Sequence, residues 1–139
     1  MKRREILSAI DFSDCSINAF EHAISVAQKA DCDLHCVWVA RSETEGKLNE
    51  DEAPETIAEA EVQFRALIKK YSWRLKNGKI TFSIRYGKVY REIVEEAKDR
   101  GSWLLVCGTH GTSGFEEFWI GSNAFKIVTS APCPTITIR

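Results

Sequence analysis

The stretch Trp103–Gly114 reads WLLVCGTHGTSG, and Gly121-Ser122 follow Gly111 after nine intervening residues. Its first five residues are continuously apolar, which is typical of a strand buried on both faces of a parallel sheet. The glycines let backbone N–H groups approach an anion closely, and the helical pattern beginning near Asn123 offers unpaired N–H groups at its start. A strand that leads through glycines into a helix predicts a phosphate-binding loop.

Apolar strand patterns and amphipathic helix patterns alternate along the rest of the chain. The strand near Ile80 alternates apolar with polar residues, which predicts one wetter face and a place near a sheet edge. The polar, acidic segment between Arg41 and Glu55 has no periodicity and is expected to be a long surface loop. The expected strands are Glu5–Ile10, Leu34–Val39, Ile80–Tyr86, Trp103–Cys107 and Thr135–Arg139, and the expected helices are Ile17–Ala27, Ile57–Leu75, Val89–Ala97 and Asn123–Ser130.

This order predicts the α/β class, with a doubly wound, mostly parallel five-stranded sheet, four helices and a Rossmann-like arrangement. Residues 1–139 are expected to form a single domain. In such sheets ligands bind beyond the carboxyl ends of the strands, where the strand order reverses. Two polar or glycine-rich segments follow strands there, namely Asp11 after the first strand and Gly108–Gly111 after the fourth.

Composition and charge bear on which partners the protein binds and in which compartment it works. The net charge of −1 gives no general attraction to nucleic acid or to anionic membranes. The apolar run after Lys2-Arg3-Arg4 is too short for a signal peptide, and no segment approaches the length of a membrane span. We therefore expect a cytoplasmic protein.

Five cysteines, an odd number without a C-x-x-C pair, are expected to be buried thiols in a reducing compartment. A zinc site built from Cys32, His35 and Cys36 is rejected, because neighbouring residues of a strand point to opposite faces.

The glycine pattern is none of three common motifs. Neither Gly78-Lys79 nor Gly87-Lys88 has the spacing of a Walker loop, and G-x-G-x-x-G is missing. The nucleophile elbow G-x-S-x-G fails at Ser113. What remains is Gly108-x2-Gly111-x9-Gly121-Ser122.

That pattern resembles the universal stress protein family, whose nucleotide-binding members carry G-x2-G-x9-G-[S/T]. The resemblance covers nearly the whole chain, from the opening strand and Asp11-Phe12-Ser13 to the ending Ala131–Arg139. It implies the adenine nucleotide alpha hydrolase-like version of the Rossmann-like fold, and a regulatory module in stress adaptation.

The resemblance also implies a role for each matching residue. Asp11 would hydrogen-bond the nucleoside, and the backbone of Ala9 and Ile10 would lie against the adenine. Either Trp38 or Val39 would close over the base. The main chain would run close to the ribose and phosphates at Gly108, Thr109, His110 and Gly111. The phosphates would be bound by Gly121, Ser122 and the N–H of Asn123. As plain alternatives, Asp11 and the glycines would only form turns, and Ser122 would only cap its helix.

One departure bears on the ligand. Glu116-Glu117 stand between the glycines, where many relatives carry basic residues, and two carboxylates repel a polyphosphate. ATP, ADP and AMP all stay open, with AMP or ADP more tenable. No magnesium carboxylate is evident beside the loop, so Mg²⁺ is expected only through the phosphates of the nucleotide.

Three functions stay open. An adenine-nucleotide-binding regulatory protein without catalytic residues comes first, since spacing identifies no acidic or nucleophilic partner for His110. The second is a slow ATPase or autokinase that uses Ser122, Thr112 or Ser113 as acceptor. The third is a dimeric interaction module that binds no nucleotide and uses the dimer surface and the acidic region Glu43–Glu61. The resemblance also implies a homodimer paired through Thr135–Arg139, and leaves other protein partners unknown.

Overall fold

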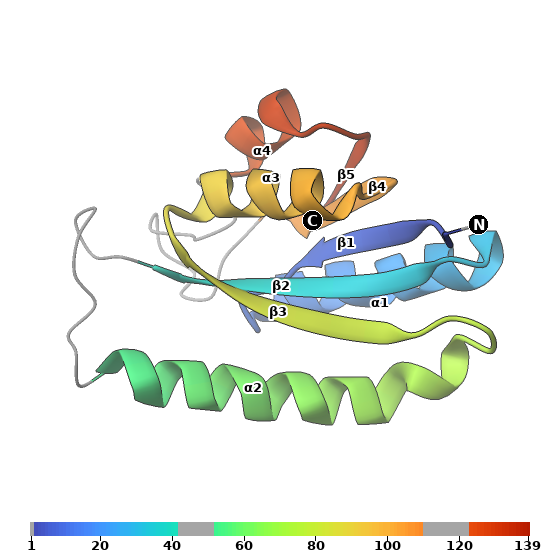
Figure 1. Cartoon of the computed structure of the whole chain (residues 1–139), viewed down its shortest axis with the longest axis horizontal. Helices are drawn as coiled ribbons and strands as arrows, with labels where there is room; N and C mark the ends of the chain where they lie inside the picture. Colours follow the sequence, from blue (N-terminus) through green and yellow to red (C-terminus); the bar gives the residue numbers. More distant parts are fainter. Residues whose placement is uncertain (1, 42–51, 110–122) are drawn as a thin grey trace.

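The five strand patterns form one parallel sheet in the order β3-β2-β1-β4-β5 (Figure 1). The computed structural model describes residues 2–41, 52–109 and 123–139. Strand order reverses between β1 and β4, which lie side by side although nearly a hundred residues separate them in sequence. The α/β class and the doubly wound order are confirmed. The strands are β1 (Glu5–Ala9), β2 (Asp33–Arg41), β3 (Ile80–Gly87), β4 (Leu104–Gly108) and β5 (Thr135–Ile138).

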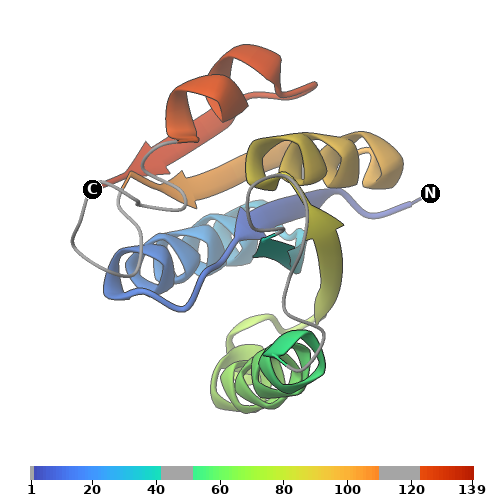
Figure 2. The same ribbon diagram turned by 90° about the vertical axis from the view of Figure 1, so that its left-hand side faces the viewer.

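Helices cover both faces of the sheet (Figures 1 and 2). One face carries α1 and α2, and the opposite face carries α3 and α4. Among the described helices, none combines the length and the hydropathy needed to cross a bilayer. The helices are α1 (Asp14–Ala30), α2 (Glu52–Tyr71), α3 (Val89–Arg100) and α4 (Ala124–Ser130).

Each face of the sheet has its own apolar core, because alternate residues of a strand point to opposite sides. Along β1, Ile6 packs toward α1 and α2, whereas Leu7 packs toward α3 and α4. Both side chains are fully buried. β1 is therefore covered on both faces, as a central strand of a parallel sheet must be.

The bounds of α2 differ from the sequence expectation at both ends. The helix begins at Glu52, so the last part of the predicted loop is helical, and Pro54 is tolerated there because the first turn needs no N–H from it. It ends at Tyr71 rather than near Asn77-Gly78, and a 3-10 turn, Ser72–Arg74, follows. Leu75 then adopts an extended conformation and is only 6% exposed. Burying Leu75 in the core is what ends the helix early.

The caps of the helices agree better with the sequence. Ser13 is the N-cap of α1, and its hydroxyl accepts a hydrogen bond from the Ser16 N–H at 3.1 Å. Gly101 ends α3 with a φ of 63°. The C-cap of α1 is Asp31, with a φ of 56°, a conformation that aspartate tolerates better than most residues.

The cysteines are free thiols, as expected. Cys32, Cys36 and Cys107 are buried, and Cys15 and Cys133 are half-buried. Burial raises the pKa of Cys107 to about 12, so this thiol stays protonated at neutral pH. Cys36 packs in the core beneath α1 and α2, whereas the neighbouring residue His35 points to α3 on the other face.

His35 belongs to a buried polar network between β2, β3 and α3. Its Nδ1 lies 2.6 Å from Thr81 Oγ1, and its Nε2 lies 2.9 Å from Ser83 Oγ and 3.0 Å from Glu96 Oε2. Glu96 also accepts hydrogen bonds from Ser83 and from Arg85 Nη1, the latter at 2.8 Å. The wetter face predicted for β3 is therefore the face that builds this network, and β3 is an edge strand.

Glu96 makes part of the folding stability dependent on pH. Burial alone would raise its pKa, but hydrogen bonds from His35, Ser83 and Arg85 lower the pKa from 4.5 to about 2. Because the unfolded chain binds the proton first, this stabilisation is present above about pH 4.5 and is lost as the pH falls toward 2. In urea unfolding we expect the wild-type protein to lose about 3 kcal/mol of unfolding free energy across this pH window. The Glu96→Gln variant should lack this loss.

The matched control is Glu95→Gln, since Glu95 is a half-exposed neighbour whose ion pair among the described residues is with Lys98, at 3.6 Å. The Glu95→Gln variant should keep the acid-dependent loss. An unchanged acid dependence in Glu96→Gln would contradict this role of the network.

Candidate functional site

The turn from β1 into α1 is built on Asp11. Its Oδ1 accepts the Ser13 N–H at 3.0 Å and the Ser13 hydroxyl at 2.5 Å. The Asp11 N–H donates to Ser16 Oγ at 3.3 Å. These contacts are those of a turn residue that supports the N-cap of a helix. Asp11 therefore has the turn-forming role that was one of its two expected roles.

The second carboxylate oxygen of Asp11 has no such role. Asp11 is only 6% exposed, and its Oδ2 is buried without a hydrogen-bond partner in the described part of the chain. A buried polar atom without a partner is costly, and a carboxylate oxygen is a strong acceptor. Oδ2 is thus available to accept a hydrogen bond from a ligand at the carboxyl end of β1.

Phe12 takes an unusual backbone conformation beside this oxygen. Its φ is 63°, and its ring packs against Phe64 of α2 with centroids 4.8 Å apart. A bulky residue in the left-handed region costs roughly 1–3 kcal/mol, and such strain tends to be kept at functional sites. The ring contact with α2 is what holds the strained turn in place.

The end of β4 lies beside this turn, as the strand order requires. Gly108 is buried, and a Cβ atom built on it would stand 2.9 Å from Cys15 Sγ and 3.2 Å from the Cys15 carbonyl oxygen. Thr109 N–H donates to the Ile138 carbonyl at 2.8 Å. The first turn of α1 can pass over β4 only because residue 108 is glycine.

The other predicted base-contacting residues lie on the neighbouring strands. Ala9 and Ile10 are fully buried, and the Ile10 N–H donates to the Val37 carbonyl at 2.9 Å. Val39 is also fully buried, on the α3 face, whereas Trp38 is half-buried and packs on the α1 face with Ile10. Only Trp38 of the two alternatives therefore keeps accessible side-chain surface.

The phosphate half of the predicted site is mostly outside the described residues. This applies to His110, Gly111, Gly121 and Ser122, and also to Thr112, Ser113 and Glu116-Glu117. Asn123 is described, and it is the N-cap of α4 without a side-chain capping bond. Of the residues predicted for the nucleoside, the structure places Asp11 and Gly108 at the ends of neighbouring strands and Trp38 in the apolar cluster that contains Ile10.

Comparison with known proteins gives the family. The model of the universal stress protein family matches residues 2–139. The chain belongs to the universal stress protein family. A universal stress protein of Methanocaldococcus jannaschii is 30% identical over 142 residues, covering 98% of this chain and 82% of that protein. The solved structure of UspA from Lactobacillus plantarum, 26% identical, superposes with a TM-score of 0.80 and covers 100% of this chain and 99% of that one.

Two further universal stress proteins of the same fold are described with bound nucleotides. One is in complex with cAMP and is 17% identical, with a TM-score of 0.69 over 100% of this chain and 99% of that one. The other, from Archaeoglobus fulgidus, is in complex with dAMP and is 19% identical. It superposes with a TM-score of 0.69 and covers 99% of this chain and 98% of that one. At these identities, the likeness to this universal stress protein concerns the fold.

Sequence reasoning missed two contributors to the site. The sequence predicts Cys15 only as one of the buried thiols, yet its sulfur and carbonyl oxygen determine that position 108 must be glycine. Phe12 enters the sequence argument only within the matching segment Asp11-Phe12-Ser13, although its strained backbone is accompanied by a ring contact with α2. A glycine at the end of a buried strand was the signal for the first, because it indicates close approach of another segment.

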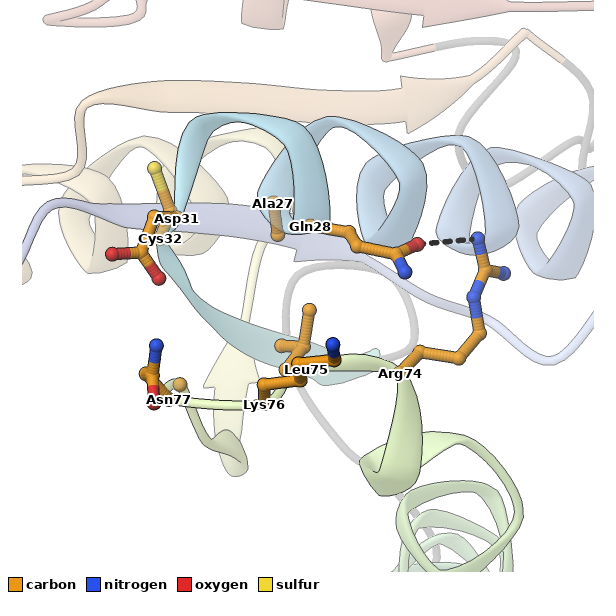
Figure 3. A pocket seen from close by; sticks show the side chains of 9 residues that line it. Ala27, Gln28, Asp31, Cys32, Arg74, Leu75, Lys76 and Asn77 are labelled. Atoms are coloured by element: carbon orange, nitrogen blue, oxygen red, sulfur yellow. Dashed lines mark hydrogen bonds between the residues drawn. The ribbon is translucent and has the colours of Figure 1, made fainter.

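A cavity of about 310 Å³ lies at the opposite end of the sheet, between the end of α1 and the segment 74–78 (Figure 3). Arg74 reaches across it, and its Nη2 donates to Gln28 Oε1 at 3.2 Å. Its lining residues lead into β2 and β3, at their amino ends, far from Asp11. This cavity is not part of the candidate nucleotide site of this universal stress protein.

The close approach of Cys15 to Gly108 predicts a measurable cost for a side chain there. Gly108→Ala should lower the free energy of unfolding by about 1–3 kcal/mol, because the added methyl group overlaps the Cys15 sulfur and carbonyl oxygen. Adding Cys15→Ala should recover only part of the loss, since the carbonyl remains. Chemical denaturation of both variants measures this, and a Gly108→Ala variant as stable as the wild type would contradict the packing.

Proposed function

We propose that the chain is a regulatory protein that binds an adenine nucleotide beyond the carboxyl ends of β1 and β4. The observation that carries the proposal is Asp11 Oδ2, a buried acceptor without a described partner, at the point where strand order reverses. A ribose hydroxyl or an adenine amino group is a suitable donor for it.

Three further features support a nucleoside ligand. Gly108 lets the backbone at the end of β4 lie close to the turn that holds Asp11. Trp38 keeps accessible ring surface near Ile10, and an aromatic face suits a planar base. The cAMP and dAMP complexes of two family members show that this fold accommodates adenine nucleotides.

A nucleotide with few phosphates is favoured over ATP. Both of those ligands carry a single phosphate group, and the acidic pair Glu116-Glu117 of this sequence disfavours a polyphosphate. Binding would shift the conformational ensemble toward the state with higher affinity for the nucleotide. We propose that this shift acts on protein partners in stress adaptation, in the cytoplasm.

Asp11→Asn tests the nucleoside contact without removing the turn. The Asn carbonyl oxygen can replace Oδ1 toward Ser13, but its NH2 group takes the place of the acceptor Oδ2. Losing a hydrogen bond to a charged group costs about 1.5–3 kcal/mol, so AMP should bind roughly 10- to 150-fold more weakly in calorimetric titration.

Asp14→Asn is the matched control, because Asp14 is an exposed carboxylate three residues away in the first turn of α1. It should leave the affinity for AMP unchanged. A wild-type protein that neither binds AMP nor gains thermal stability from AMP, ADP or ATP would contradict the proposed function, since a ligand at 100 times its dissociation constant adds about 2.7 kcal/mol.

We also propose that the protein is a homodimer paired through β5. This strand lies at the edge of the sheet, and Ile136 is 37% exposed. Phe125 and Val128 of α4 are 77% and 48% exposed beside it. An edge strand with apolar neighbours of this kind is suited to pairing with a second copy.

Ile136→Lys should therefore convert the dimer to a monomer in sedimentation experiments, because it places a charge in the paired edge. Val62→Lys provides the comparison, since Val62 is 64% exposed on α2, away from β5. A wild-type protein that is monomeric at high concentration, or a dimer that Ile136→Lys leaves intact, would refute pairing through β5.

A further inference from the structure

The amino ends of β1, β4 and β5 surround a second hollow, at the end of the sheet opposite Asp11. Three segments line this cavity of about 490 Å³, namely residues 2–5 before β1, 100–103 before β4 and 132–134 before β5. We call it the amino-end pocket. The labelled N-terminus in Figure 1 marks this end of β1.

Positive charge is concentrated in the amino-end pocket. Four of its lining residues are cationic and one, Glu5, is anionic, although the whole chain has a net charge of −1. Arg100 is neutralised by Glu5 through contacts of 2.6 and 3.0 Å. Arg3 pairs with Asp31 and Asp33 outside the pocket. Lys2 and Arg4 have no carboxylate partner in the described part of the chain and account for the excess charge.

Arg4 is held in place by contacts with a ring and a backbone carbonyl rather than by a salt bridge among the described residues. Its guanidinium lies over the ring of Trp103, 4.3 Å from the ring centroid, and donates to the Ala30 carbonyl at 3.0 Å. Trp103 itself is 39% exposed. A cation fixed on an aromatic ring loses less side-chain entropy when it binds an anion.

A buried hydroxyl adds a hydrogen-bond donor to the pocket. Ser102 lines it and is 8% exposed, and its Oγ is buried without a partner among residues 2–41, 52–109 and 123–139. The negative end of α3 lies nearby, but the Gly101 and Ser102 N–H groups donate to its Lys98 and Ala97 carbonyls at 3.1 and 3.0 Å. These bonds reduce the repulsion that an anion would meet there.

We propose that the amino-end pocket binds a small anion that carries a di- or oligophosphate group. An ammonium group, a guanidinium group and a hydroxyl all offer hydrogen-bond donors, which suit the oxygens of a phosphate. Because Lys2 and Arg4 are exposed, one negative charge would be bound weakly, so the ligand needs several. This site is independent of the proposed nucleotide site.

The test uses inorganic pyrophosphate as the probe and the Trp103 indole N–H as the reporter, followed by NMR and assigned with Trp103→Phe. Pyrophosphate should shift this signal along a saturating curve, and more salt should weaken the binding. The double variant Lys2→Ala/Arg4→Ala should bind about tenfold more weakly or worse. Asp11→Asn should leave the response unchanged, because Asp11 lies at the other end of the sheet.

The double variant Arg65→Ala/Lys69→Ala is the matched control. It also removes one arginine and one lysine, from an exposed part of α2, and should not alter the affinity for pyrophosphate. The proposal is overturned if pyrophosphate does not shift the Trp103 signal, or if the control weakens binding as much as Lys2→Ala/Arg4→Ala. It is also overturned if a hexaglutamate peptide saturates the signal at lower concentration than pyrophosphate, which would assign the pocket to acidic peptides.

Ser102→Ala separates binding from folding. Because the hydroxyl has no described partner, its removal should leave the thermal stability unchanged or raised, and should still weaken pyrophosphate binding. A Ser102→Ala variant that binds pyrophosphate as tightly as the wild type would overturn the role assigned to this hydroxyl.

Discussion

The parallel pairing of β1 with β4 is the constraint on which the candidate site depends. In this register Ile6 pairs with Leu104 and Ser8 with Val106, so both strands end at the same edge of the sheet. After β1 the chain forms α1 on one face of the sheet, and the helix that follows β4, α4, lies on the opposite face. That divergence opens the space beyond the two strand ends. Asp11 and Gly108 are functional candidates because the pairing brings them there.

The buried carboxylates of Glu96 and Asp11 differ in how many of their oxygens have hydrogen-bond partners. In the network of His35 and Glu96, both ring nitrogens and both carboxylate oxygens have hydrogen-bond partners. Such a satisfied network stabilises the contact of α3 with β2 and β3. Asp11 satisfies one oxygen within its turn and leaves the other without a described partner. The contrast separates a carboxylate whose two oxygens both have partners from one that keeps an unpaired buried oxygen among the described residues, which is why we propose Asp11 as the ligand contact.

Much of this arrangement could be predicted from sequence periodicity. The run Leu34–Val39 correctly predicted a strand, and the alternation near Ile80 correctly placed the strand β3 at an edge. The run Trp103–Cys107 correctly predicted a buried strand except at Trp103, which lies before β4 and is 39% exposed. The early end of α2 could not be predicted, because it follows from the burial of Leu75 in a core that only the folded chain contains. The family resemblance predicts that Asp11 contacts the nucleoside. It does not predict that Oδ1 bonds Ser13 while Oδ2 stays unpaired among the described residues, because this depends on the folded geometry of the turn. The same holds for Lys2 and Arg4, because no sequence pattern indicates that they line a pocket with Trp103.

The most direct test of the central claim is a crystal structure of the protein grown with AMP. The account predicts that Asp11 Oδ2 lies within about 2.6–3.2 Å of a hydroxyl or amino group of the nucleoside, beyond the ends of β1 and β4. AMP bound elsewhere on the protein, with Asp11 Oδ2 still without a partner, would contradict it.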